Sequence, residues 1–419
     1  MSKNFRDWDV DQVWLLPPSI NDFVPDGHVA HFVRDTVCTG LDLSLIYRSY
    51  KRDRGQPPFH PAMMVALLLY AYSQGIYASR RMAKACEERV DFMAVTGMQK
   101  PDFRTIAKFR RRHLPALRLL FVESLRLCRE AGLVELGHVS LDGTKIKANA
   151  SKHKAMSYGR MREAEPVLAK TVEDWMKEAD STDAEDDRSH GSDRRGDEPP
   201  DWMASKQSRL AKIQAAKAAL EAEAKAAGKE APEDKAQRNF TDAESRLQKT
   251  KDGFIQGYNA QAVVDHANQV IVACDVGASS ADNPQLVPMI DQVTANTGAV
   301  PNEVSADAGY IAEANLAALE ERGIDAYIAP GRQRHGKPAP SAAQPVDPET
   351  RVGRMAAKLR EGARASPYHL RKVTVEPVFG QIKQARGFRQ FLLRGLAQVK
   401  AEWAMVCTAH NLCKLAAAR

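Results

Sequence analysis

The sequence predicts an α/β protein in which an all-helical N-terminal unit precedes a domain built on a mixed sheet, with a helical insertion after the first strand of that sheet. Two observations support this prediction. Apolar residues recur at helical spacing up to about residue 134 and alternate at strand spacing from residue 138 onward. The 419 residues also exceed one small domain, and the 44% of hydrophobic residues suffices for more than one core. We therefore expect domains at residues 1–134 and 135–419, with the insertion at about residues 155–250.

The N-terminal unit is predicted to contain at least four helices. Pro61 suits the first turn of a helix that runs to about Ser73, and Asp102 can cap a later helix. Further helices are expected at residues 80–88 and 117–130, and a short one at 28–37. The helix after Asp102 is apolar on one side and carries four candidate DNA contacts, namely Arg104, Lys108, Arg110 and Arg111. A basic helix of this kind fits a DNA groove, although a helical bundle with solvated arginines would show the same pattern.

The second domain begins with an alternating strand at residues 138–142, which places Ser140 and Asp142 on one face. Strands at 258–265 and 270–276 are joined by a short polar link, so a hairpin is predicted. A helix at 283–297, a strand at 303–306, a helix at 313–322 and a strand at 325–328 follow. The last helical run spans residues 392–417.

The stretch between the first strand and the hairpin does not fit the sheet. Residues 181–201 are polar and acidic and predict a mobile loop, whereas residues 202–227 are rich in Ala, Lys and Glu and predict a helix. We expect the whole insertion to lie outside the sheet, with its helix as a solvated arm or a dimer element.

Positive charge is concentrated in two places. Residues 51–113 hold 13 Lys and Arg against 5 Asp and Glu, and residues 351–400 hold 12 against 2. Each local excess, +8 and +10, is larger than the net charge of +7 for the whole chain. Such patches attract polyanions, and nucleic acid is the most common of these.

The predicted elements follow the order strand, hairpin, helix, strand, helix, strand, helix, which is the ribonuclease-H-like order. In that order one acid lies on the first strand, one follows the fourth strand and one lies on a late helix, and this chain has an acid at each of the three places. Asp142 lies on the first strand, Asp307 follows the fourth strand and Glu376 lies on the late helix. Phosphodiester cleavage by metals uses two Mg²⁺ ions about 3.5–4 Å apart, and Mg²⁺ takes a few carboxylates together with waters and phosphate oxygens. Asp142, Asp307 and Glu376 are therefore the candidate catalytic residues and metal ligands.

The stretch from Tyr368 to Lys383 contains one of these acids. Thr374 is expected to cap its helix, with Pro377 in the first turn. Glu376 and Lys383 share one line along the edge of an apolar stripe. An acid at the edge of a buried stripe and near cations suggests a metal ligand in a site for a nucleic-acid backbone, while an exposed helix with an ordinary charge pair is the alternative.

Two other groups of residues have simpler interpretations. Asp282 is expected to cap the helix that follows it rather than to join the site. The six scattered cysteines include no CxxC pair, and Cys407, His410 and Cys413 fit core packing better than a zinc site. Reduced thiols and the lack of a long apolar run favour a cytoplasmic protein.

Four stretches together resemble the DDE transposases of bacterial insertion sequences, specifically the family numbered eleven eighty-two. They are His60–Met63 with Thr105–Arg110, Leu141–Lys145, Ala306–Tyr310 and Tyr368–Lys383. The stretch Lys249–Gln261 also resembles the return of that family's chain to its sheet. The resemblance runs from about residue 10 to 415.

The resemblance implies a metal-dependent DNA strand transferase that uses Mg²⁺, with Mn²⁺ as a substitute. Asp142 would bridge both metals, and Asp307 and Glu376 would complete the set. Tyr368 and Lys383 would hold the DNA backbone with either Arg371 or Lys372, since the spacing leaves both open. The partners would be the terminal inverted repeats and target DNA, held by a homodimer in the bacterial nucleoid. The missing cysteine cluster between Cys274 and Cys407 argues against structural zinc.

Two alternatives to a transposase remain at the level of the sequence. One is a non-catalytic DNA-binding protein derived from such an enzyme, which the presence of all three acids disfavours. The other is a nuclease of the same fold that cuts DNA without joining it, and only the detection of joined products separates it from a transposase.

Overall fold

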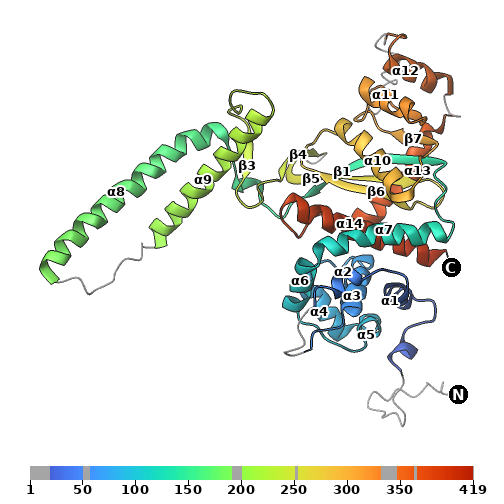
Figure 1. Cartoon of the computed structure of the whole chain (residues 1–419), viewed down its shortest axis with the longest axis horizontal. Helices are drawn as coiled ribbons and strands as arrows, with labels where there is room; N and C mark the ends of the chain where they lie inside the picture. Colours follow the sequence, from blue (N-terminus) through green and yellow to red (C-terminus); the bar gives the residue numbers. More distant parts are fainter. Residues whose placement is uncertain are drawn as a thin grey trace, which may run out of the picture.

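The computed structural model describes residues 19–50, 57–190, 201–250, 253–331, 347–362 and 366–418, with side chains at 178–190, 201, 202 and 204 excepted. Within these residues the chain forms a helical N-terminal region, a mixed sheet with helices on both faces, and a long helical arm (Figure 1). The expected lead-in at residues 1–18 and most of the Pro/Gly-rich linker before residue 347 lie outside the described residues.

The N-terminal region contains seven described α-helices, so the predicted helices are present and others join them. Pro61 starts α3 and Asp102 caps α6 through the backbone N–H groups of Arg104 and Thr105, as expected. The bounds are α1 Val29–Thr39, α2 Ser44–Tyr47, α3 Pro61–Ser73, α4 Ser79–Glu88, α5 Val90–Thr96, α6 Phe103–Arg112 and α7 Leu114–Glu130.

The six-stranded sheet has the order β4-β5-β1-β7-β8, with β6 also paired to β5. β1 runs antiparallel to β5 and parallel to β7. The bounds are β1 His138–Lys147, β4 Arg246–Thr250, β5 Gly253–Asp265, β6 Ile271–Gly277, β7 Glu303–Ala306 and β8 Asp325–Ile328. The predicted strands are therefore present, and residues 246–250, which were expected outside the sheet, form one of its strands.

Helices cover both faces of the sheet, because alternate residues of its strands are apolar on each side. One core joins β1 and β5 to α13, α14 and the N-terminal helices, and the other joins β1 and β7 to α10 and α11. α7 runs beside α14, so the helical region packs against the sheet domain through these two helices (Figure 1). The bounds are α10 Leu286–Thr297, α11 Glu313–Glu321, α12 Arg351–Gly362, α13 Leu370–Gly380 and α14 Leu396–Ala417.

The insertion forms an arm of two antiparallel helices, α8 Tyr158–His190 and α9 Asp201–Ala226, that extends away from the sheet (Figure 1). A small apolar cluster closes its base, where β2 Ala155–Ser157 pairs with β3 Gln237–Asn239. The ion pair between Lys217 and Glu165 joins the two helices at 2.8 Å. The loop predicted at residues 181–201 is helical as far as His190; this part of the stretch contains neither Gly nor Pro, the two strongest helix breakers, before Gly191.

Candidate active site

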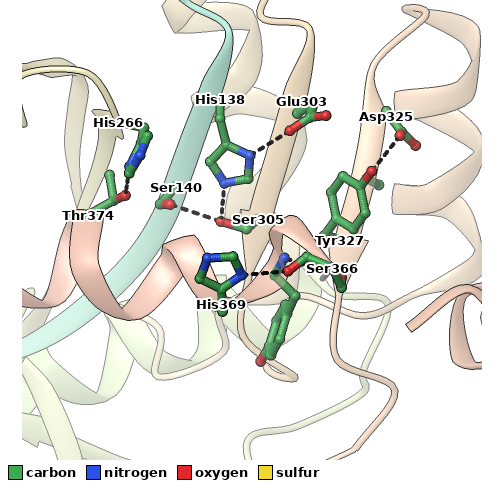
Figure 2. A network of polar contacts seen from close by, with 12 residues as sticks. His138, Ser140, His266, Glu303, Ser305, Asp325, Tyr327, Ser366, His369 and Thr374 are labelled. Carbon is green, nitrogen blue, oxygen red and sulfur yellow. Dashed lines mark hydrogen bonds and ion pairs between the residues drawn. The ribbon is translucent and has the colours of Figure 1, made fainter. Parts of the chain in front are cut away.

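A row of polar side chains crosses β1 and β7 on one face of the sheet (Figure 2). The parallel register pairs His138 with Glu303 and Ser140 with Ser305. The two nitrogens of His138 lie 2.9 Å from the Glu303 carboxylate and 2.9 Å from the Ser305 hydroxyl, and the two serine hydroxyls lie 2.8 Å apart. The two strands are thus joined by side chains as well as by their backbones, and the row leads toward their carboxyl ends.

Two acids continue this row. Asp142 lies two residues beyond Ser140 on β1, and Asp307 directly follows β7. Side chains two positions apart in a strand share a face, so the same register brings the two carboxylates level with each other. Burial raises the pKa of Asp142 to about 7, and the negative charge of Asp307 contributes to the rise.

Each of these acids is oriented by a backbone N–H group close to it in sequence. Gly143 donates to Oδ1 of Asp142 at 2.7 Å, and Gly309 donates to Oδ1 of Asp307 at 2.8 Å. These bonds leave the second oxygen of each carboxylate available for another partner. The arrangement is one that an open α/β sheet offers at its strand ends, where ligands bind.

Glu376 lies on α13, and this helix begins earlier than predicted. α13 starts at Leu370, so Thr374 and Pro377 lie inside it and the expected N-cap is wrong. Pro377 has no N–H to donate to the carbonyl of Val373, and the side chain of Gln269 donates to that oxygen instead, at 3.0 Å. The Thr374 hydroxyl is hydrogen-bonded to His266 at 2.8 Å (Figure 2), which fastens the helix to the β5–β6 hairpin.

Arg371 connects Glu376 with the sheet. Its guanidinium donates to Oδ2 of Asp142 at 3.1 Å and to Oε1 of Glu376 at 3.0 Å. The side chain is largely buried, with 14% exposed, while Glu376 is 49% exposed. Lys372 is exposed on the surface. Of the two residues that the sequence left open, Arg371 is therefore the one that contacts the acids.

The other two expected members of this stretch also lie beside the site. Lys383 donates from Nζ to the Thr144 hydroxyl at 2.8 Å, two residues beyond Asp142 on the same face of β1. Burial, with a smaller effect of Arg389, lowers the pKa of Lys383. Tyr368 is half-buried next to Arg371, and burial raises the pKa of its hydroxyl.

Asp282 differs from the expectation that it caps a helix. Among the described residues its side chain makes no capping bond to the 3-10 turn Asn283–Gln285. It instead accepts hydrogen bonds from Lys145, Asn259 and Gln261, on β1 and β5. The sequence contained a signal for this, because Asn259 and Gln261 alternate as polar residues within an otherwise apolar strand.

The basic side chains of helix α6 differ in their exposure to solvent. Arg104, Lys108 and Arg111 are exposed. Arg110 is only 7% exposed, and its guanidinium donates to the Tyr72 hydroxyl at 3.3 Å and to the Tyr77 carbonyl at 2.9 Å. The expected DNA contact by Arg110 is therefore wrong, because this side chain faces the interior of the helical region.

Cys407 and His410 lie in the interior, as expected, whereas Cys413 is only partly buried. Cys407 and His410 are fully buried on α14, and Nε2 of His410 is hydrogen-bonded to the carbonyl of Gln269 at 2.9 Å. In the part of the chain that the structure describes, no three His, Cys, Asp or Glu side chains lie together closely enough to hold a metal ion. No described helix is both long and apolar enough to cross a bilayer.

Comparison with known families identifies the two parts of the chain. Residues 18–112 match a family described as "Transposase domain (DUF772)", and residues 227–412 match one described as "Transposase DDE domain". Searches of the curated proteins and of the solved structures gave no match. A helical region and a sheet domain that each match a transposase family define the class of the protein. Both matches confirm the resemblance to DDE transposases of insertion sequences.

Proposed function

We propose that the chain is a DNA transposase that cuts at the terminal inverted repeats of its insertion sequence and joins the freed 3′ ends to target DNA. The observation that supports this best is the register of β1 and β7, which brings Asp142 level with Asp307 while Arg371 connects Asp142 to Glu376. We also propose that residues 135–419 form a ribonuclease-H-like domain. The sheet order β4-β5-β1-β7-β8, with β6 beside β5, supports this assignment.

The donor set at the strand ends suits divalent cations. All three acids offer carboxylate oxygens, which Mg²⁺ and Mn²⁺ prefer. Burial is the main cause of the raised pKa of Asp142; the negative charge of Asp307 adds to the rise, and the charge of Arg371 opposes it. In the structure Arg371 lies between Asp142 and Glu376, and no three described acids are close enough to share one ion. Asp142, Asp307 and Glu376 would therefore hold Mg²⁺, or Mn²⁺ as a substitute, only once the ion replaces this contact of Arg371, and bound ions would supply activation of the attacking oxygen and stabilisation of the leaving oxygen.

The protein's own residues orient these groups and the DNA. Arg371 connects Asp142 with Glu376, and Lys383 and Tyr368, which lie beside these acids, are proposed to contact the phosphate backbone. Lys372 and the exposed Arg104, Lys108 and Arg111 are proposed to contact phosphates farther from the cut. A homodimer that brings two ends together, in the bacterial cytoplasm with the nucleoid, is part of the same proposal.

A strand-transfer assay tests the proposal. The wild-type protein, with Mg²⁺, is mixed with a fragment that carries the repeats flanking its own gene and with a supercoiled target plasmid. We expect nicks at the repeats and covalently joined products, and we expect Asp307→Asn to lose both. Asp291→Asn, on the outer helix α10, is the matched control and should behave as wild type. Nicks without joined products would identify a nuclease, and binding without nicks would identify a DNA-binding protein.

A further inference from the structure

Asp282 lies in the segment that follows β6, where β1 continues past the end of β7. Its Oδ1 accepts three hydrogen bonds, from Nζ of Lys145 at 3.2 Å, Nδ2 of Asn259 at 2.6 Å and Nε2 of Gln261 at 3.1 Å. The side chain is only 18% exposed. A largely buried carboxylate oxygen with three donors is firmly held, because charge-assisted bonds are the stronger kind.

The same contacts continue to the turn that carries Asp307. The Tyr310 hydroxyl donates to Oε1 of Gln261, whose amide group binds Asp282. The amide of Asn315 then donates to the carbonyl of Tyr310 at 2.8 Å and to that of Asn283 at 2.8 Å. The turn after β7 is thus connected, through Tyr310 and Asn315, to the segment of Asp282.

Two glycines close to the acids leave the space that Asp282 occupies. A Cβ atom at Gly143 would lie 2.4 Å from Nε2 of Gln261 and 3.0 Å from Oδ1 of Asp282. One at Gly309 would lie 2.9 Å from Oδ1 of Asp307 and 3.1 Å from Oδ2 of Asp282. Neither glycine has a positive φ, so backbone conformation does not require glycine at these positions. Glycine is required at these positions because a larger side chain would have no space. Asp282 lies between Gly143, which follows Asp142, and Gly309, two residues after Asp307.

We propose that Asp282 is a positioning residue of the acidic site. It fixes the ends of β1 and β7 through Lys145, Gln261 and Tyr310, and thereby the geometry in which Asp142 and Asp307 present their oxygens. The inference rests on the proposed function for the identity of the site, and it adds a fourth acid that acts through the others. Removal of such supporting groups typically weakens metal binding or activity by about 10–100-fold.

The test measures the binding of Mn²⁺ alone, from the loss of the free-ion electron paramagnetic resonance signal, in the full-length protein without DNA. Asp282→Ala is expected to weaken the affinity at least about tenfold. Asp282→Asn should lie closer to wild type, because its amide oxygen can accept the same three bonds. Asp291→Asn is the matched control. An Asp282→Ala protein that binds Mn²⁺ within about twofold of wild type would overturn the inference, since outer partners typically cost more.

A second variant keeps the test decisive if Asp282→Ala fails to fold. Tyr310→Phe removes the hydroxyl that donates to Gln261, and so breaks the connection between the turn of Asp307 and Asp282 while both acids stay unchanged; Mn²⁺ affinity should fall as well. Tyr327→Phe, which removes a hydroxyl bonded to Asp325 on β8, is its control. Tyr310→Phe with wild-type affinity would contradict the inference.

Failure of the proposed function gives a different result. A wild-type protein that binds Mn²⁺ but cuts no DNA would refute the function, while the order of affinities among the variants would still decide the role of Asp282. A wild-type protein that binds no Mn²⁺ would overturn both.

Discussion

The guanidinium of Arg371 donates to the carboxylate of Asp142 at 3.1 Å, across 229 positions of the sequence. This bond joins α13 to the central strand of the sheet. Burial and the charge of Asp307 raise the pKa of Asp142, and the charge of Arg371 opposes that rise. Arg371 therefore connects the strand of Asp142 with the helix of Glu376, and its charge lowers the pKa of Asp142 from the value that burial would otherwise give.

Replacement of Arg371 by alanine should shift the pH dependence of cleavage. Loss of the positive charge raises the pKa of Asp142 further, so the carboxylate form requires a higher pH. The rising limb of the cleavage-against-pH profile is expected to move to higher pH, and the rate at pH 7 should fall about tenfold or more. Lys372→Ala, next to it but exposed, should leave the limb in place. Coincident profiles for Arg371→Ala and wild type would refute this role.

Asp142→Asn should stabilise the metal-free protein at high pH. The folded pKa of about 7 lies above the unfolded value of about 3.9, so the folded state binds the extra proton between these values. The stabilisation that the wild type gains from protonated Asp142 is fully present below about pH 4 and is lost as the pH rises to 7. Asn does not titrate, so the variant does not lose this stabilisation. The unfolding free energy of Asp142→Asn minus that of the wild type should thus be about 2 kcal/mol larger at pH 8 than at pH 5.

Urea unfolding with a chelator present measures this gain, and Asp291→Asn is its control. A gain that is the same at both pH values would show that Asp142 does not titrate in this range.

Two adjacent arginines of α6 should affect different properties: Arg110 the stability of the protein and Arg111 its binding of DNA. Arg110→Ala removes a buried cation and leaves the Tyr77 carbonyl without this donor, so it should destabilise the protein by about 3 kcal/mol. Arg111→Ala, on the exposed side, should change stability by less than about 0.5 kcal/mol. It should instead weaken DNA binding and reduce the salt dependence of the binding constant by about one unit of slope. Urea unfolding and binding titrations at several salt concentrations measure these effects, and the reverse assignment would contradict the burial of Arg110.

The sequence predicted the elements whose causes are local. The alternation from His138 and the capping by Asp102 each depend on near neighbours, and both are present. The parallel pairing of β1 with β7 then places Asp142 and Asp307 together, as the strand order indicated.

The remaining features depend on distant residues. α13 extends back to Leu370 because Gln269, 104 positions away, bonds the carbonyl that Pro377 leaves free. Arg110 differs from Arg111 only through the tertiary contacts with Tyr72 and Tyr77. Asp282 precedes a helix in sequence, as a capping residue would, but its donors come from β1 and β5. Periodicity can single out such residues, as the polar alternation of Asn259 and Gln261 in β5 does, but it does not identify their distant partners.

The most direct test of the account is cleavage by Glu376→Gln. Purified wild-type and variant proteins are mixed, in Mg²⁺ and separately in Mn²⁺, with the DNA that flanks the gene, and Glu361→Gln on α12 is the matched control. We predict specific nicks at the element ends with the wild type and the control, and no nicks with Glu376→Gln, whose fold and DNA affinity should be unchanged. Cleavage by Glu376→Gln at the wild-type rate, with its fold intact, would contradict the assignment of the acidic site.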